Sequence, residues 1–392
     1  MVPPVKHRLS ERARAVVPSL IRDASRYCDE LGALNLAQGL PDFAAPAFLK
    51  EAAQRAIAAD RNQYCDPWGL AQLREAIAAK CARDNALAVD PATQVTVCCG
   101  ATEGLNLALM ALLDPGDEVV VFSPFYENYR PNLATVEAKP RYVPLSAPDW
   151  RVDEAVLERA FAGTAPRAVI VNNPANPTGK VWSRQELELV ARYCERYDAY
   201  AITDEIYEYI LYDGAEHISL AALAGMAERT VTVSGLSKTF CVTGWRLGYV
   251  IASEPLTAAI RRLHDFLTIC APAPMQHAAV AALEAPADYY ADLRRLYQAK
   301  RDRLVTALYR SGFEPVRPAG AYYVWTDAGV LGAKNALEAA GRLAIEAGIA
   351  AVPGDCFLPP GHPNCNLRFC YAKSDQTLAA AVERLDRWSG HG

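Results

Sequence analysis

Residues Val231 to Ile251 read VTVSGLSKTFCVTGWRLGYVI. This stretch opens with a β-branched run, which favours a buried strand, and the run stops at Ser234 and Gly235. Lys238 then stands in a short loop of small and hydroxylic residues, and a Thr-Gly-Trp tripeptide leads to an arginine. A lysine in a loop is usually solvated, so this lysine identifies nothing by itself. The combination of strand, small-residue turn, lysine and arginine is what indicates a special site.

Length and composition restrict the class of protein. A chain of 392 residues exceeds the usual size of a single core, so two domains are expected. Hydrophobic residues make up 52% of the chain and charged residues 22%, which is typical of a soluble globular protein. The net charge of −5 offers no electrostatic attraction for nucleic acid or an anionic membrane. Small molecules are therefore the expected partners.

The sequence also bears on the cellular location of the protein and on whether it binds a metal. The charged N-terminal segment lacks the apolar core of a secretion signal, and the longest uncharged stretch, 266–283, contains two prolines and is a poor membrane span. Eleven cysteines without C-x-x-C spacing favour free thiols in a reducing cytoplasm. His362, Cys365 and Cys370 match no zinc spacing, so no metal site is predicted.

Short apolar runs alternate with helical patterns along the first two thirds of the chain. This alternation predicts an α/β fold with an open, mostly parallel sheet that is covered on both faces. The predicted strands lie at 95–99, 117–122, 168–172, 200–203 and 231–233. Five residues follow just past their carboxyl ends, where such sheets bind ligands: Gly100, Tyr126, Asn176, Asp204 and Lys238.

Two of these positions already indicate a chemistry. Gly100, Ala101 and Thr102 join a strand to a helix, an arrangement in which free backbone N–H groups hold a phosphate. That signal is weak alone, because most strand-to-helix connections contain a glycine. Asp204 ends a buried strand and needs a partner, since an unpaired buried carboxylate is costly. The alternative is that Asp204 merely caps a helix.

Taken together, the lysine segment and the string Asn173-Pro-Ala-Asn-Pro-Thr-Gly179 resemble the fold-type I, class I/II aminotransferases that depend on pyridoxal 5′-phosphate. The resemblance extends from about Gly39 to Arg368. It implies a mostly parallel seven-stranded sheet with helices on both faces, together with a smaller α+β domain. We expect a large cofactor-binding domain over 46–280, and a small domain formed by 1–45 together with 281–392.

The resemblance assigns a cofactor role to each residue of the rim. It implies that Lys238 holds pyridoxal phosphate as a Schiff base and that Arg246 clamps the phosphate with its flat guanidinium. Backbone groups of the Gly100 turn also meet the phosphate, and the hydroxyl of either Ser234 or Ser237 joins them. The remaining implied roles concern the cofactor ring: Tyr126 stacks on it, Asp204 pairs with its nitrogen, and Asn176 and Tyr207 reach its phenolic oxygen.

Three further roles follow from the same resemblance. Tyr64, in the pattern Tyr-x4-Gly-x3-Leu-Arg, is expected to reach the cofactor phosphate of a neighbouring subunit, so a homodimer with shared active sites is predicted. Gly39, before Leu-Pro-Asp-Phe, is expected to cross the mouth of the site and, like Asn176, to bind the substrate. Arg368, the odd residue in an apolar strand, is expected to bind the substrate α-carboxylate. A surface ion pair is the alternative for Arg368.

The implied reaction moves the amino group of an L-amino acid to a 2-oxo acid, with Lys238, Asp204 and Tyr207 as catalytic residues. Because no second arginine can be placed for a side-chain carboxylate, and tyrosines recur near the motifs, we expect a neutral or aromatic donor. The kynurenine, glutamine and methionine-type aminotransferases are the nearest resemblance. A pyridoxal-phosphate-dependent lyase, cyclase or oxidase is the alternative. A transcription regulator would need a DNA-binding domain, and the residues before Gly39 show no helix-turn-helix pattern.

Overall fold

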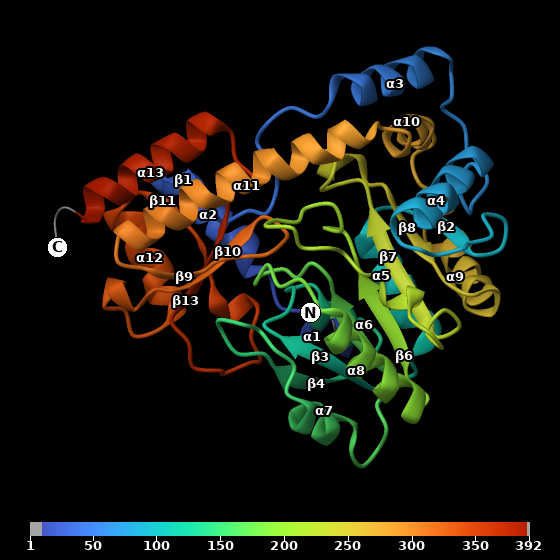
Figure 1. Ribbon diagram of the computed structural model, residues 1–392, viewed down its shortest axis with the longest axis horizontal. Coiled ribbons are helices and arrows are strands. Elements are labelled where there is room, and N and C mark those ends of the chain that lie inside the picture. Colours follow the sequence, from blue (N-terminus) through green and yellow to red (C-terminus); the bar gives the residue numbers. More distant parts are fainter. Residues whose placement is uncertain (1–9, 390–392) are drawn as a thin grey trace, which may run out of the picture.

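The computed structural model describes residues 10–389, and a seven-stranded sheet forms its centre (Figure 1). The strand order is β2-β8-β7-β6-β5-β3-β4. Neighbouring strands run parallel except around β8, which is antiparallel to both β2 and β7. The predicted sheet is therefore confirmed. Its strands are β2 (Val95–Cys98), β3 (Glu118–Ser123), β4 (Lys139–Pro144), β5 (Ala168–Asn172), β6 (Tyr200–Asp204), β7 (Thr230–Gly235) and β8 (Gly248–Ile251).

Helices cover both faces of this sheet because the side chains of each strand alternate between the faces. In β3, Val119 and Val121 belong to one buried cluster, and Val120 and Phe122 belong to another. The first face carries α5 (Ala101–Leu112), α6 (Tyr129–Thr135) and α9 (Glu254–Leu267). The second face carries α7 (Glu154–Phe161) and α8 (Arg184–Arg196). A third cluster includes residues of α3 (Ala47–Ala58), α4 (Ala71–Asp84) and α10 (Ala273–Leu283).

The start of α8 shows how local sequence sets a helix boundary. The Ser183 hydroxyl accepts a hydrogen bond from the Glu186 backbone N–H, and the Glu186 carboxylate accepts one from the Ser183 N–H at 3.0 Å. The two residues thus satisfy two donors that a helix start leaves unpaired. Ser183 and Glu186 have the three-residue spacing typical of a capping box, so this helix start is readable from the sequence.

A second, smaller sheet forms the other part of the molecule, and the long helix α11 (Ala287–Arg310) runs between the two parts (Figure 1). This sheet is antiparallel with the order β12-β13-β10-β9. Its elements, with the helices beside them, are β9 (Glu314–Val316), β10 (Tyr323–Asp327), α12 (Ala336–Glu346), β12 (Val352–Pro353), β13 (Asn366–Cys370) and α13 (Asp375–Ser389). Short 3-10 helices lie at Leu220–Ala222, Thr243–Trp245, Gly329–Leu331 and Gly354–Cys356.

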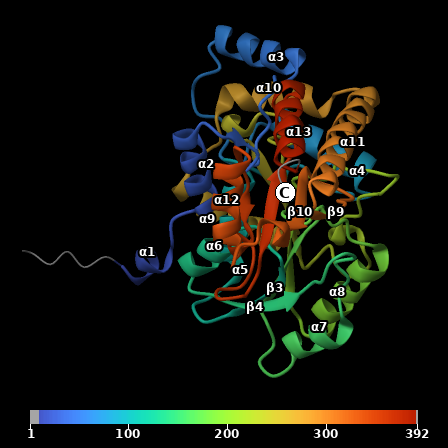
Figure 2. The ribbon, with the colours of Figure 1, turned by 90° about the vertical axis from the view of Figure 1, so that its left-hand side faces the viewer.

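The N-terminal arm belongs structurally to this second part. The short strand β1 (Leu34–Asn35) pairs in parallel with β11 (Ile349–Ala350), although the two lie at opposite ends of the chain. Helix α2 (Leu20–Leu31) packs beside α12, and α1 (Glu11–Ala15) stands further out (Figure 2). The pairing of β1 carries the segment that follows it toward the carboxyl edge of the large sheet.

The predicted division of the chain into 46–280 and the remainder stays a prediction. Residue 280 lies inside α10, and the first nine and last three residues of the proposed small domain lie outside the described residues. All eleven cysteines carry free thiols. Across residues 10–389, no helix combines the length and apolar character needed to cross a membrane.

Candidate active site

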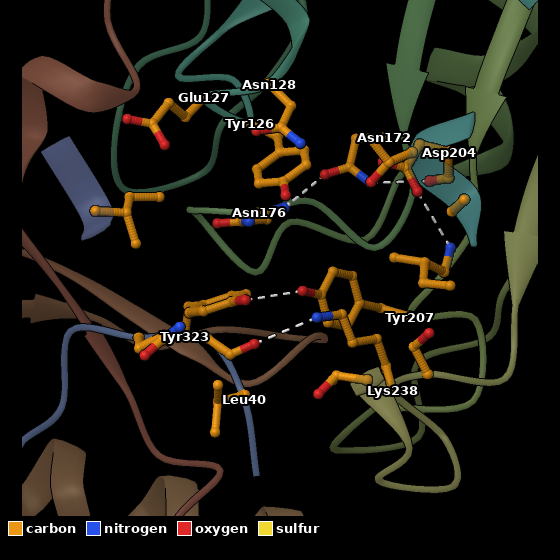
Figure 3. A pocket seen from close by; sticks show the side chains of 18 of the residues that line it. Leu40, Tyr126, Glu127, Asn128, Asn172, Asn176, Asp204, Tyr207, Lys238 and Tyr323 are labelled. Carbon is orange, nitrogen blue, oxygen red and sulfur yellow. Dashed lines mark hydrogen bonds between the residues drawn. The ribbon is translucent and has the colours of Figure 1, made fainter. Parts of the chain in front are cut away.

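A cavity of about 490 Å³ opens at the carboxyl edge of the large sheet and faces β10 and β13 of the small sheet. The strand ends bring together most of the predicted site residues, which are far apart in sequence (Figure 3). Those lining the cavity are Gly39, Ala101, Thr102, Tyr126, Asn176, Asp204, Tyr207, Ser237, Lys238, Arg246 and Arg368. Gly100 lies directly behind the lining, against Arg246. Tyr64 and Ser234 do not line the cavity.

Lys238 reaches into the cavity from the loop after β7. Its Nζ donates a hydrogen bond to the Gly39 carbonyl oxygen at 3.2 Å and lies 5.9 Å from the ring centroids of Tyr207 and Tyr322. Burial lowers the pKa of the Lys238 amine to about 8, because the charged form loses its water. A substantial share of this amine is therefore neutral near physiological pH, and only a neutral amine acts as a nucleophile.

Asp204 is the last residue of β6, and its carboxylate is buried. Burial raises the pKa of this carboxyl group, while a hydrogen bond from the Tyr129 hydroxyl at 2.9 Å opposes the rise. No helix begins at Asp204, so the alternative of a helix cap is excluded. Asn172 supports the same corner, since its Nδ2 donates to the Asp204 carbonyl oxygen and its Oδ1 accepts from the Asn176 N–H (Figure 3).

The opposite wall offers an anion site. Helix α5 begins at Ala101, and no side chain within residues 10–389 caps it, so its first N–H groups stay available. Arg246 lies next to this helix start, where its guanidinium donates to the carbonyl oxygens of Thr243 at 3.1 Å and Cys99 at 3.3 Å. Gly100 has a φ of +79°, and a Cβ there would come within 2.5 Å of Arg246 Nη2. Only glycine allows this close approach.

Arg368 points from β13 into the cavity and is 1% exposed. Its Nη1 donates to Asn176 Oδ1 at 2.9 Å and its Nη2 donates to the Ala37 carbonyl oxygen at 2.6 Å. The guanidinium also lies over the rings of Tyr323 and Phe357, at 4.2 and 4.7 Å. Within the described part of the chain, the buried Nε has no hydrogen-bond partner. These contacts exclude the surface ion pair and leave a donor for an incoming anion.

The N-terminal arm crosses the mouth of the cavity as a strap, residues 37–40. Lys373 Nζ donates to the carbonyl oxygens of Gln38 and Leu40, at 3.2 Å each, and thereby fixes the strap from behind. A Cβ on Gly39 would lie 2.1 Å from the Tyr323 hydroxyl oxygen, so the strap passes this tyrosine only as glycine. Tyr323 in turn shares a hydrogen bond of 2.8 Å with the Tyr207 hydroxyl.

Comparison with known proteins decides the family. Residues 32–385 match the family model described as aminotransferase class I and II. The chain belongs to this family.

Individual relatives cover nearly the whole chain. The probable N-succinyldiaminopimelate aminotransferase DapC of Mycobacterium tuberculosis is 37% identical, over 95% of this chain and 97% of that protein. The methionine aminotransferase of Escherichia coli is 36% identical, over 94% of this chain and 95% of that protein. The solved aspartate aminotransferase of Thermus thermophilus with maleate has a TM-score of 0.90 at 36% identity, over 97% of this chain and 100% of that one. The named substrates thus differ between relatives.

As a class I and II aminotransferase, the protein depends on pyridoxal 5′-phosphate. The donor set of the cavity fits this cofactor. The uncapped start of α5 and the Arg246 guanidinium suit a phosphate, the buried Asp204 suits a cationic ring nitrogen, and the partly neutral Lys238 suits an aldehyde.

Two predicted residues of this aminotransferase lie away from the cavity. Tyr64 is 77% exposed and does not contribute to the active-site cavity of its own chain. The Ser234 hydroxyl is buried behind the sheet, where it donates to Glu208 at 3.1 Å, whereas Ser237 lines the cavity. The structure therefore favours Ser237 for the open choice between the two serines.

Sequence reasoning did not identify several lining or supporting residues. Tyr129 follows Tyr126 by three positions, a helical spacing that could have pointed to the same site. Tyr323 opens β10, and no motif in the sequence gives it a role. Arg22, Gln38 and Glu127 gave no local signal, because only tertiary packing brings them to the cavity.

Proposed function

We propose that this aminotransferase takes the amino group from a neutral or aromatic L-amino acid and passes it to a 2-oxo acid through a Schiff base on Lys238. The observation that carries the proposal is the buried Arg368, whose Nε lacks a partner in the described chain and whose guanidinium lies over the rings of Tyr323 and Phe357. Tyr126, Tyr207 and Tyr323 give the cavity beside it apolar, flat surfaces. Such surfaces favour neutral and aromatic side chains.

Each residue has a separate task in this proposal. Arg368 holds the substrate α-carboxylate with a two-pronged hydrogen bond, so that the Cα–H bond points toward Lys238. Pyridoxal phosphate, when bound, supplies an aldehyde carbon that links to an amine and a ring that withdraws electrons from Cα. The Lys238 amine, with its pKa of about 8, would take the proton from Cα and pass it to C4′, the former aldehyde carbon of the cofactor. The Asp204 carboxylate would stabilise the positive charge on the ring nitrogen of the cofactor.

The working unit in this proposal is a homodimer with shared active sites. Tyr64 lies outside its own cavity, which is consistent with service to a neighbouring subunit. Two large apolar side chains at the end of α9 are also exposed: Phe266 is 90% exposed and Leu267 is 56% exposed. Burial of such side chains stabilises association. The free thiols are consistent with the reducing cytoplasm as the location.

The central test compares the native enzyme with Lys238→Ala. We expect the native enzyme to show the visible absorbance of a Schiff base and to transaminate neutral or aromatic amino acids. The variant should lose that absorbance and lose about 10²- to 10⁴-fold or more in turnover. Retention of both by the variant would refute the role of Lys238, and activity on aspartate without any on neutral or aromatic donors would refute the donor class.

A second measurement separates transamination from the lyase, cyclase and oxidase alternative. A single turnover with donor and no oxo acid should convert the bound cofactor to pyridoxamine phosphate in stoichiometric amount. Release of the donor's products with regeneration of pyridoxal phosphate would instead support the alternative.

A further inference from the structure

His264 is a buried histidine that has no part in the proposed reaction. It lies near the end of α9 and is fully buried. Its Nδ1 lies 2.9 Å from Glu103 Oε1, and its Nε2 donates to the Pro67 carbonyl oxygen at 2.8 Å. A carbonyl oxygen can only accept a hydrogen bond, so Nε2 carries a proton, and an ionised Glu103 requires a second proton on Nδ1. The two contacts therefore hold this ring as an imidazolium opposite a carboxylate.

The charges of this pair stabilise each other. Burial opposes the charged form of His264, but hydrogen bonds to Glu103 and Pro67 outweigh it and raise the pKa of the imidazole above its ordinary 6.5. Burial also opposes ionisation of Glu103, yet hydrogen bonds from the imidazole, Thr268 and Cys99 lower its pKa. His264 is thus mostly protonated at pH 6.5, and it loses its proton only as the pH rises through the raised pKa. Until then the pair as a whole carries no net charge.

The elements that pack around the pair carry four other charged groups: Asp66, Arg74, Arg261 and Asp265. The first two pair with each other at 3.4 Å, and the third donates to a backbone carbonyl oxygen at 2.7 Å. The fourth, Asp265, adds to the rise in the pKa of His264. Among the described residues, Glu103 is therefore the charged group that directly contacts the imidazole.

Glu103 also connects the pair to the anion site. It lies in the first turn of α5, and its carboxylate accepts a hydrogen bond from the Cys99 N–H. The carbonyl oxygen of the same Cys99 accepts one from Arg246 at 3.3 Å. Because Cys99 directly precedes Gly100, Glu103 fixes the turn that leads into the uncapped helix start. The geometry of the anion site therefore depends on a carboxylate.

A carboxylate in this position creates an electrostatic conflict. The start of a helix attracts an anion through its dipole and its free N–H groups, and Glu103 already lies there. A second anion, the cofactor phosphate, would be repelled by the first, and burial keeps water and salt from screening that repulsion. The proton on His264 removes most of the repulsion because it neutralises Glu103.

We infer that Glu103 and His264 are positioning residues for the cofactor phosphate: the carboxylate fixes the Gly100 turn, and the imidazolium cancels the charge that would repel the phosphate. The inference rests on the proposed function, in which this turn and Arg246 hold the phosphate. It follows that the enzyme retains its cofactor best while His264 is protonated. Retention should weaken as the pH rises and the imidazole loses its proton, because the charge of Glu103 is then uncancelled.

The test measures the binding of pyridoxal phosphate, and of pyridoxal, which lacks the phosphate, to cofactor-free enzyme. The visible Schiff-base absorbance reports both. The dissociation constant for pyridoxal divided by that for pyridoxal phosphate isolates the contribution of the phosphate, because both ligands form the same bond with Lys238. Four proteins are compared: the native enzyme, His264→Gln, the double variant with Glu103→Gln and His264→Gln, and the control His362→Gln. His362 is exposed on the loop before β13, so its replacement removes an imidazole away from the anion site.

At pH 6.5 we expect His264→Gln to weaken the binding of pyridoxal phosphate about tenfold, with little change for pyridoxal. The double variant should regain most of that affinity, because it also removes the uncancelled carboxylate. His362→Gln should match the native enzyme. Equal losses for both ligands, no loss for either, or no recovery in the double variant would overturn the inference.

The pH dependence of the native enzyme gives a second test that needs no variant to fold. From pH 7 to 9 a phosphate monoester is largely dianionic, since its second pKa is about 6. The ratio of dissociation constants should therefore fall in the native enzyme as His264 loses its proton, and stay level in His264→Gln. A level ratio in the native enzyme would overturn the inference.

Arg246→Gln keeps the proposed function separate from this inference. Full affinity of that variant for pyridoxal phosphate would refute the proposed phosphate site itself. A loss of affinity in Arg246→Gln with none in His264→Gln would refute the positioning pair alone.

Discussion

The two ends of the active-site cavity are built in different ways. The cofactor end takes its side chains and backbone groups from the ends of β2, β6 and β7, which are neighbours or near neighbours within one sheet. The substrate end combines the strap 37–40, helix α2 and strand β13, which belong to the small-sheet side of the molecule. One end is therefore held by a single hydrogen-bonded framework, and the other depends on how two parts of the chain meet.

Because the two ends are built separately, substrate specificity can change at one end without loss of the cofactor chemistry at the other. The relatives share the family, yet their names cite N-succinyldiaminopimelate, methionine and aspartate as substrates. In the proposed function, groups such as Asp204 and Arg246 hold a cofactor that stays the same between relatives. Residues of the strap and of α2 line the other end of the cavity, and they lie on segments that tolerate change. Four predictions test this contrast.

The largest effect is expected at the cofactor end. Asp204→Asn keeps the shape of the side chain and removes the charge that, in the proposed function, faces the ring nitrogen of the cofactor. We expect kcat to fall about 10²- to 10³-fold, because a buried charge loses its partner. Tyr129→Phe is the matched control, since it removes only the hydrogen bond to Asp204 and should cost about tenfold. Equal losses in the two variants would show that the charge itself is unimportant.

A smaller loss, confined to substrate binding, is expected at the other end. Arg368→Lys keeps the positive charge and removes the flat two-pronged donor. We expect kcat/KM to fall about 10- to 100-fold for every amino acid tested. Retention of the bound cofactor during dialysis should stay unchanged, because Arg368 contacts the strap and Asn176 and not the anion site at the start of α5. Loss of the cofactor from the variant would contradict the separation of the two ends.

The pKa of Lys238 predicts how cofactor capture depends on pH. Burial lowers this pKa from 10.5 to about 8, so the amine is mostly protonated at pH 7 and half neutral near pH 8. The rate of colour formation by cofactor-free enzyme should therefore rise about fivefold from pH 7 to 8 and level off above that. N-acetyl-lysine methyl amide, an ordinary amine, should continue to gain rate up to about pH 10. A continued rise in the enzyme would show that the pKa is not lowered.

The smallest effect separates the two serines near the lysine. Ser237→Ala should weaken retention of the cofactor by about 1 kcal/mol, measured by dialysis, and leave the free energy of unfolding of the cofactor-free protein unchanged. Ser234→Ala should leave retention of the cofactor unchanged and lower the free energy of unfolding, because it removes a buried hydroxyl that donates to Glu208. Loss of cofactor in Ser234→Ala alone would reverse the assignment.

Much of the fold could be predicted because its signals are local. The strands expected over 168–172 and 200–203 are β5, Ala168–Asn172, and β6, Tyr200–Asp204. Two strands of the large sheet were not located. β4 contains two prolines and lies at the edge of the sheet, where proline is tolerated, and β8 has only four residues and carries no alternation.

Five strands of the large sheet, and the identity of the groups that follow their carboxyl ends, could be read from the sequence. Those features depend on side-chain alternation and turn chemistry, which a few neighbouring residues set. Three placements became visible only in the folded chain: Tyr129 contacts Asp204, Ser237 and not Ser234 lines the cavity, and Arg22 stands at its edge. These placements join segments that are distant along the chain, so they depend on how the two sheets and the N-terminal arm pack against one another.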